Sequence, residues 1–206
     1  MSTSNLPDPN AVWPAGMRIE VLVPEQLEFL LFARSALKLS ANGVPPLDHH
    51  PDGGDTYRLA PSLAAQLDII WIGDWQRTFQ QFEPISTEVK PPDFVTQHLL
   101  DTVDDEDLWE AVSGTSEVWD TVLDLPAYYA WLRRWRIAPQ VPVGYESEVR
   151  ALPAVIEAWQ GGLTTIIDLP YKGYFADRIS TTHLVVSSET RHYADSYSRA
   201  LATPAP

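Results

Sequence analysis

Alternation of apolar and polar residues predicts a short strand near the start of the chain. In residues 17–23 (MRIEVLV), every second side chain from Ile19 is apolar, as expected for an extended segment with one buried face. Two segments rich in β-branched residues follow much later, at 163–169 and 182–186. Because a two-stranded sheet is marginally stable alone, we expect the early strand to join the later pair in one sheet.

Helical periodicity dominates the interior, about residues 24–160. Apolar residues recur there at spacings of three and four, and helix-starting prolines or acids and helix-ending glycines punctuate the pattern. The predicted helices run from Pro24 to about Asn42, Ser62 to about Phe82, Asp93 to Leu100, Asp104 to Gly114, Thr115 to Leu123, Pro126 to Pro139, Glu146 to Gln160, and Arg191 to Leu201, the last capped by Thr190.

The combined pattern predicts an α+β fold. We expect one mainly helical domain over residues 15–201, with a small sheet of about three strands built from the N-terminal strand and the C-terminal pair. Residues 1–14 are polar and contain several prolines, which indicates a flexible N-terminal arm. Residues 202–206 are expected to form a flexible tail.

The amino-acid composition excludes several classes of protein and of functional site. The 206 residues include no cysteine, which excludes disulfides, zinc ribbons, iron–sulfur thiolate sites and thiol nucleophiles. The hydrophobic content of 45% is too high for intrinsic disorder. A formal charge of −14 repels phosphate backbones and anionic membrane surfaces. We therefore expect a cytoplasmic protein that binds neither nucleic acid nor membrane, with its oligomeric state left open.

Negative charge is concentrated between Asp101 and Asp124, a run with nine acids and no lysine or arginine. One interpretation is a solvated helical face, because acids are favoured near helix N-termini. The other is a docking surface for a basic protein partner. The candidate partner-binding residues are Asp101, Asp104, Asp105, Glu106, Asp107 and Glu110.

Arginines follow the acidic run directly, at Arg133, Arg134 and Arg136. Guanidinium groups suit phosphate or carboxylate ligands, but with so many acids nearby, neutralisation within the chain is favoured over an external anion. Arg34 lies on an otherwise apolar helical stripe. Because a charge there needs a partner, we expect a carboxylate beside it.

The segment DHHPDGGD at residues 48–55 is a candidate metal site. Carboxylates and imidazoles close together can hold a divalent cation, which can generate hydroxide at neutral pH. The alternative is a solvated turn, where Asp, Pro and Gly are favoured by backbone geometry. The candidate ligands are Asp48, His49, His50, Asp52 and Asp55.

Four of the eight tryptophans form two pairs spaced by four residues, Trp71 with Trp75 and Trp131 with Trp135. Each pair therefore shares one face of a helix. This spacing is typical of a helical core. If a pair were exposed, it would form the wall of a small-ligand pocket.

Catalytic signatures are missing from the sequence. It contains no phosphate-binding loop, no dinucleotide fingerprint and no His-Glu-x-x-His motif. Serine, histidine and aspartate gather near the C-terminus without a nucleophile elbow; they are Asp168, His183, Ser187, Ser188, His192 and Asp195.

The leading hypothesis is a non-catalytic binding or accessory factor that engages a basic protein and needs no cofactor. The alternatives are a metal-dependent hydrolase using residues 48–55 and a small-ligand protein with a tryptophan-lined pocket.

Overall fold

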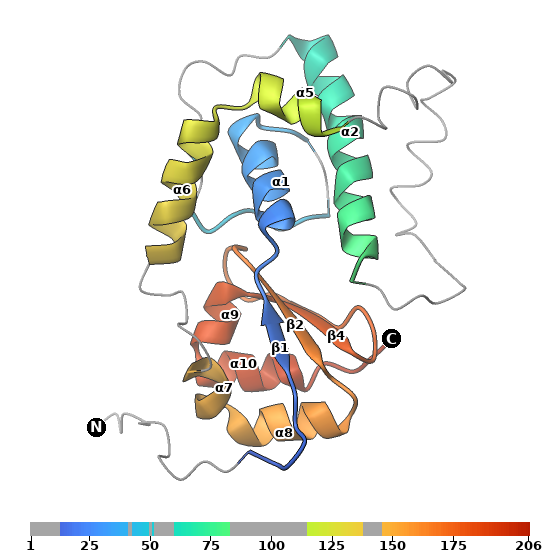
Figure 1. Cartoon of the computed structure of the whole chain (residues 1–206), viewed down its shortest axis with the longest axis vertical. Helices are drawn as coiled ribbons and strands as arrows, with labels where there is room; N and C mark the ends of the chain where they lie inside the picture. Colours follow the sequence, from blue (N-terminus) through green and yellow to red (C-terminus); the bar gives the residue numbers. More distant parts are fainter. Residues whose placement is uncertain (1–12, 41–42, 50, 52–59, 83–114, 138–145) are drawn as a thin grey trace. The chain divides into compact units, whose positions relative to one another are not determined.

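The computed structural model describes residues 13–40, 43–49, 51, 60–82, 115–137 and 146–206 (Figure 1). Contacts divide the chain into two compact units. The sheet unit comprises the described parts of 1–28, 45–49 and 132–206, and the helical unit comprises those of 29–44 and 50–131. The architecture is α+β and mainly helical, as predicted. The boundaries of a single domain at 15–201 stay a prediction.

One mixed sheet forms the centre of the sheet unit. Its strands are β1 (Glu20–Leu22), β2 (Thr165–Leu169), β3 (Ala176–Asp177) and β4 (His183–Ser187), in the order β1-β2-β4-β3. β1, β2 and β4 are parallel, and β3 runs antiparallel to β4. The prediction that the early strand joins the late pair is confirmed. The predicted strand count was wrong, because a two-residue strand such as β3 is too short to show alternation.

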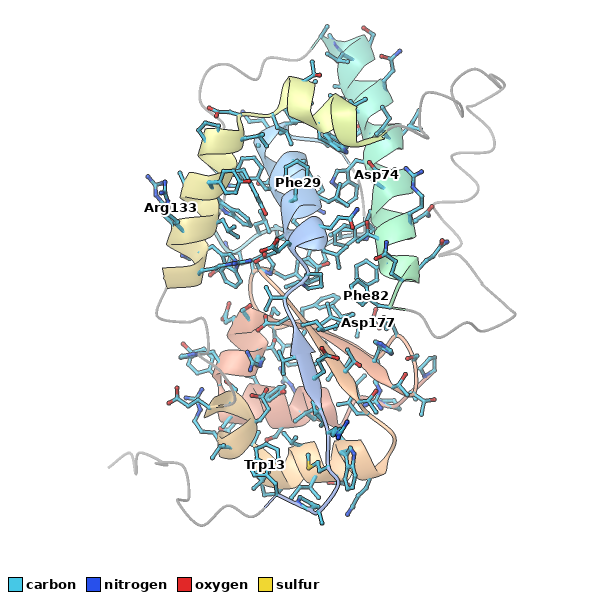
Figure 2. The ribbon with its side chains drawn as sticks, in the orientation of Figure 1. Trp13, Phe29, Asp74, Phe82, Arg133 and Asp177 are labelled. Atoms are coloured by element: carbon cyan, nitrogen blue, oxygen red, sulfur yellow. The ribbon has the colours of Figure 1, made fainter. Side chains whose placement is uncertain are left out.

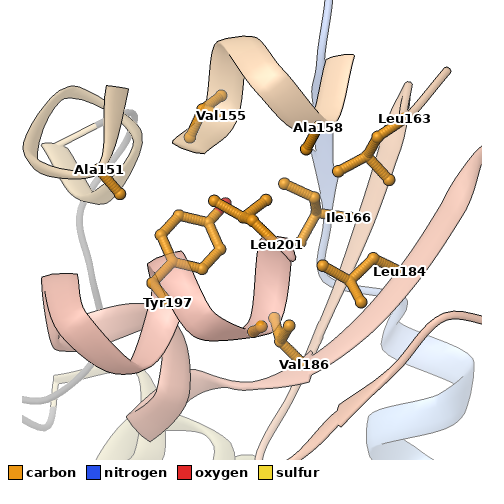
Figure 3. Packing of buried hydrophobic residues seen from close by; sticks show 10 residues of the cluster. Ala151, Val155, Ala158, Leu163, Ile166, Leu184, Val186, Tyr197 and Leu201 are labelled. Atoms are coloured by element: carbon orange, nitrogen blue, oxygen red, sulfur yellow. The ribbon is translucent and has the colours of Figure 1, made fainter. Parts of the chain in front are cut away.

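Two helices cover one face of this sheet (Figure 3). They are α8 (Leu152–Gln160) and α10 (Ala194–Leu201). Their apolar side chains meet alternate residues of β2 and β4, and the main members of the cluster are Val155, Ala158, Leu163, Ile166, Leu184, Val186, Tyr197 and Leu201. Each fully buried aliphatic side chain contributes about 1.5–3 kcal/mol relative to exposure, so this cluster stabilises the sheet unit.

The segment 146–160 forms two helices, where the pattern predicted one. α7 (Glu146–Arg150) ends at Ala151, whose φ of −108° and ψ of 19° depart from helical values, and α8 then begins. Pro153 supplies the physical reason. It has no N–H to donate to the carbonyl of Val149, and its ring would clash with that carbonyl in a continuous helix.

The C-terminal helix is also divided. α9 (Ser188–His192) is capped by Ser187, whose Oγ accepts a hydrogen bond from the Thr190 N–H at 3.1 Å. Tyr193 is extended, with φ −98° and ψ 121°, and separates α9 from α10. The prediction that Thr190 caps one helix was therefore wrong. Both Ser187 and Thr190 are good caps, and the residue nearer the strand end is the one used.

The helical unit contains α2 (Pro61–Gln80), α5 (Thr115–Val122) and most of α1 (Glu25–Ala36) and α6 (Leu125–Ile137). α1 ends earlier than the predicted Asn42-Gly43 stop, because Lys38 adopts a left-handed φ of 54°. The helices predicted at 93–100 and 104–114 lie outside the described residues. None of the described helices combines the length and apolarity needed to cross a bilayer.

Leu184 is 0% exposed within the core of the sheet unit, so Leu184→Ala removes buried methyl groups and leaves a cavity. We expect the free energy of unfolding to fall by about 2–5 kcal/mol, measured by urea titration with tryptophan fluorescence. Val23→Ala is the control, since Val23 is 42% exposed and its truncation should cost roughly 0.5 kcal/mol or less. Equal losses in the two variants would contradict the assigned core.

Candidate functional site

Two buried carboxylates share one guanidinium group in the sheet unit. Arg191 on α9 donates from Nε and Nη2 to the two carboxylate oxygens of Glu148 on α7, both at 2.9 Å. Its Nη1 donates to Asp168 Oδ2 on β2 at 3.2 Å. The three side chains are at most 4% exposed. The fork of one arginine thus joins a strand to two helices in the geometry that gives the strongest protein ion pairs.

Hydroxyl groups complete this network. The phenol of Tyr197 on α10 donates to Glu148 Oε1 at 2.8 Å, and Ser188 Oγ donates to Asp168 Oδ1. Each of the four carboxylate oxygens therefore accepts at least one hydrogen bond. Such saturation offsets the large cost of removing the charges from water. We call Glu148, Asp168, Ser188, Arg191 and Tyr197 the buried network.

The charges of the buried network do not balance, because two carboxylates meet one arginine. Burial raises the pKa of Asp168 to about 6, although the charge of Arg191 and the hydrogen bond from Ser188 oppose this. Burial alone would lower the pKa of Arg191, but its bonds to Glu148 and the charge of Asp168 raise it overall. Burial and the Glu148 carboxylate raise the pKa of the Tyr197 phenol. Asp168 is thus the member that exchanges a proton in mildly acidic solution.

This network differs from the Ser-His-Asp arrangement that the sequence allowed on paper. Asp168 contacts Ser188 and Arg191 and is 2% exposed, so a substrate has no access to it. His183 lies elsewhere, with Nδ1 2.9 Å from Thr182 Oγ1. Sequence reasoning did not single out Glu148 or Arg191. The available signal was Asp168 itself, because an acid that follows Ile166 and Ile167 in a core strand needs a buried partner such as a cation.

A further buried carboxylate lies in the first turn of α1. Glu28 is 0% exposed and accepts hydrogen bonds from Trp135 Nε1 at 2.7 Å and from Arg136 Nη2 at 3.0 Å. Burial raises the pKa of Glu28, against the effect of both donors. Arg136 also lies 3.5 Å from Glu25. The arginine expected to neutralise the acidic run therefore pairs with carboxylates of α1.

Arg133 and Arg134 are exposed, whereas Arg34 is buried. Arg133 and Arg134 are exposed on α6, and Arg133 points away from the helix (Figure 2). Arg34 donates from Nη1 to the Val44 carbonyl at 2.6 Å, and its guanidinium lies 5.7 Å from the ring centroid of Trp71. These contacts compensate its burial. The carboxylate expected beside Arg34 stays a prediction.

The predicted metal ligands are only partly described. His49 Nδ1 lies 3.1 Å from Asp48 Oδ2, and the Asp48 N–H donates to the Pro170 carbonyl at 3.0 Å. His50, Asp52 and Asp55 lie outside the described residues. In the part of the chain that is described, no three His, Asp or Glu side chains converge as metal ligands. The metal-dependent hydrolase stays a prediction.

Three of the four paired tryptophans are buried, and Trp75 is half-buried. Trp71 donates from Nε1 to the Leu30 carbonyl at 2.6 Å and stacks on Trp75 with ring centroids 5.1 Å apart. Trp131 packs against Phe32 at 5.7 Å. These contacts are those of core indoles. The tryptophan-lined ligand pocket stays a prediction.

The six candidate partner-binding residues, from Asp101 to Glu110, lie outside the described residues. Within the run, the described carboxylate is Asp124, which is exposed and accepts a hydrogen bond from the Ala127 N–H at 3.2 Å. Asp124 thus caps α6, as expected for an acid at a helix start. This one contact agrees with a solvated face and leaves the docking interpretation open.

Comparison with known proteins provides no relative for this chain. No protein-family model matches the sequence, and neither a curated protein nor a solved structure matches it.

The raised pKa of Asp168 predicts a pH-dependent stability. Its ordinary pKa in an unfolded chain is about 3.9, and the folded value is about 6, so the folded state binds the extra proton between these values. The free energy of unfolding should therefore fall as pH rises through this window, by about 3 kcal/mol from this residue.

Comparison with Asp168→Asn isolates this effect, because Glu28, Asp68 and Asp177 also have raised pKa values. Urea unfolding of both proteins at several pH values from 4 to 7.5 should show a stability difference that changes with pH. Exposed Asp195→Asn should leave the wild-type pH profile unchanged. A constant difference between wild type and Asp168→Asn would refute the proton uptake.

Proposed function

We propose that this protein is a non-catalytic binding factor that engages a basic protein partner through residues 101–124. The observation that carries the proposal is charge segregation. Nine acids and no lysine or arginine occur within that segment, in a chain whose formal charge is −14. Such a concentration of one sign attracts the opposite sign over distances of about a Debye length, roughly 8–10 Å at physiological salt.

Ion pairs elsewhere in the chain support this proposal. Arg191 is committed to Glu148 and Asp168, and Arg136 to Glu28 and Glu25. These carboxylates all lie outside 101–124. Arg191 and Arg136 therefore pair with carboxylates outside the acidic run. This pairing favours a cation from another molecule as the partner of the run.

The buried network argues against serine-hydrolase chemistry at the Ser, His and Asp residues that gather near the C-terminus. The Ser188 hydroxyl donates to Asp168, and both residues are buried. A serine nucleophile needs an exposed hydroxyl and a base that accepts its proton. In the buried network, Ser188 and Asp168 instead connect α9 to β2.

Selective neutralisation of the acidic run tests the proposal. The triple variant Asp104→Asn, Asp105→Asn, Asp107→Asn removes three negative charges from the run. We expect its affinity for poly-L-lysine, measured by titration calorimetry, to fall about tenfold at low salt. Affinity of the wild type should also weaken steeply as salt rises, because screening shortens the reach of the charges.

A matched control separates a docking surface from general acidity. Glu146→Gln, Glu157→Gln, Asp195→Asn removes the same charge from exposed positions of the sheet unit. This variant should retain nearly wild-type affinity. If the two triple variants lose affinity equally, binding reflects net charge and the assignment of the acidic run fails.

A further inference from the structure

β1 is an edge strand of the sheet. Strand order places β1 at one end, and among the described residues it pairs with β2 alone. All five residues of β2 are buried, whereas Glu20 of β1 is exposed and Val23, just after it, is 42% exposed. An exposed edge strand presents backbone groups that can pair with another chain.

The backbone of β1 points alternate residues toward this edge. The Glu20 N–H donates to the Thr164 carbonyl at 2.8 Å, so Glu20 faces β2. In a parallel ladder the next residue faces the other way. The N–H and C=O of Val21 are therefore directed toward the open side, where an added strand would find a donor and an acceptor.

A pocket of about 760 Å³ lies where the chain enters β1. Trp13, Met17, Ile19 and Val149 supply apolar lining, and Trp13 is 38% exposed beside this segment (Figure 2). The volume of the pocket is within the range that holds organic ligands. An indole face at its side suits an aromatic group.

Two opposite charges lie on one face of the same segment. Arg18 and Glu20 are two residues apart, so their side chains project to the same side of an extended chain. Both are exposed and line the pocket. Neither forms an ion pair with another of the described residues. A partner with complementary charges would place an acidic residue opposite Arg18 and a basic residue opposite Glu20.

We propose that this edge binds an extended peptide segment as an additional strand. The peptide carries an acidic residue opposite Arg18, a basic residue opposite Glu20, and an aromatic residue that enters the pocket beside Trp13. Antiparallel addition is favoured, because antiparallel pairs are slightly more stable per residue. The main chain supplies affinity and the alternate side chains supply selectivity. This surface is independent of the acidic run.

Capped pentapeptides test the proposal. The matching probe is Lys-Thr-Glu-Thr-Trp, and the control probe Glu-Thr-Lys-Thr-Trp exchanges the two charges. By titration calorimetry, the wild type should bind the matching probe about tenfold more tightly than the control probe. The control probe replaces two opposite-charge cross-strand pairs with like-charge pairs. The double variant Arg18→Glu, Glu20→Arg should reverse the preference. An unchanged preference in the double variant would overturn the proposal.

Amide hydrogen exchange tests strand addition itself. The matching probe should slow exchange of the Val21 N–H and leave the Glu20 N–H, which is already bonded to β2, unchanged. Probe binding without protection of Val21 would overturn strand addition. Protection that rises with protein concentration in the absence of probe, with a dimer in sedimentation, would assign the edge to a second copy and would also overturn the proposal.

Discussion

The position of the Arg191 guanidinium between Glu148 and Asp168 is the constraint on which the sheet unit depends. It connects β2, α7 and α9 through charge-assisted hydrogen bonds, and Tyr197 extends the connection to α10. A buried pair of this kind adds little net stability over apolar packing, but removal of one partner leaves an uncompensated charge and costs about 3–5 kcal/mol. The apolar core packs these elements together, and the ion pair determines which residues must face one another.

Buried acids serve the same role in the rest of the chain. Glu28 holds the indole N–H of Trp135, and Asp74 on α2 accepts from the indole of Trp119 at 2.9 Å and from Arg77. Figure 2 shows Asp74 within the helical unit. A protein with many carboxylates can use some of them to satisfy buried donors, and such polar contacts are directional where apolar packing is not. Some acids of this chain therefore serve as buried acceptors, while nine others are concentrated in the sequence between Asp101 and Asp124.

β1, β2 and β4 could be predicted from the sequence because they carry alternation or β-branched runs, and because a pair of strands needs a third. The breaks at Ala151 and Tyr193 could not be predicted in the same way. Pro153 is tolerated in the first turn of a helix as well as inside a kinked one, and the apolar pattern continues across Tyr193. The buried network joins residues from distant segments, and pattern analysis weighs each segment alone. Asp168 indicated that a cation was needed, but only the packed structure selected Arg191.

The parallel pairing of β1 with β2 has a consequence for how the chain folds. More than half of the sequence separates these adjacent strands, so their contact closes a very long loop and its entropy must be overcome before pairing is rewarded. During synthesis, β1 leaves the ribosome long before its neighbour exists. The helices encoded between them can form first, and the central sheet is completed only when residues 165–187 have emerged.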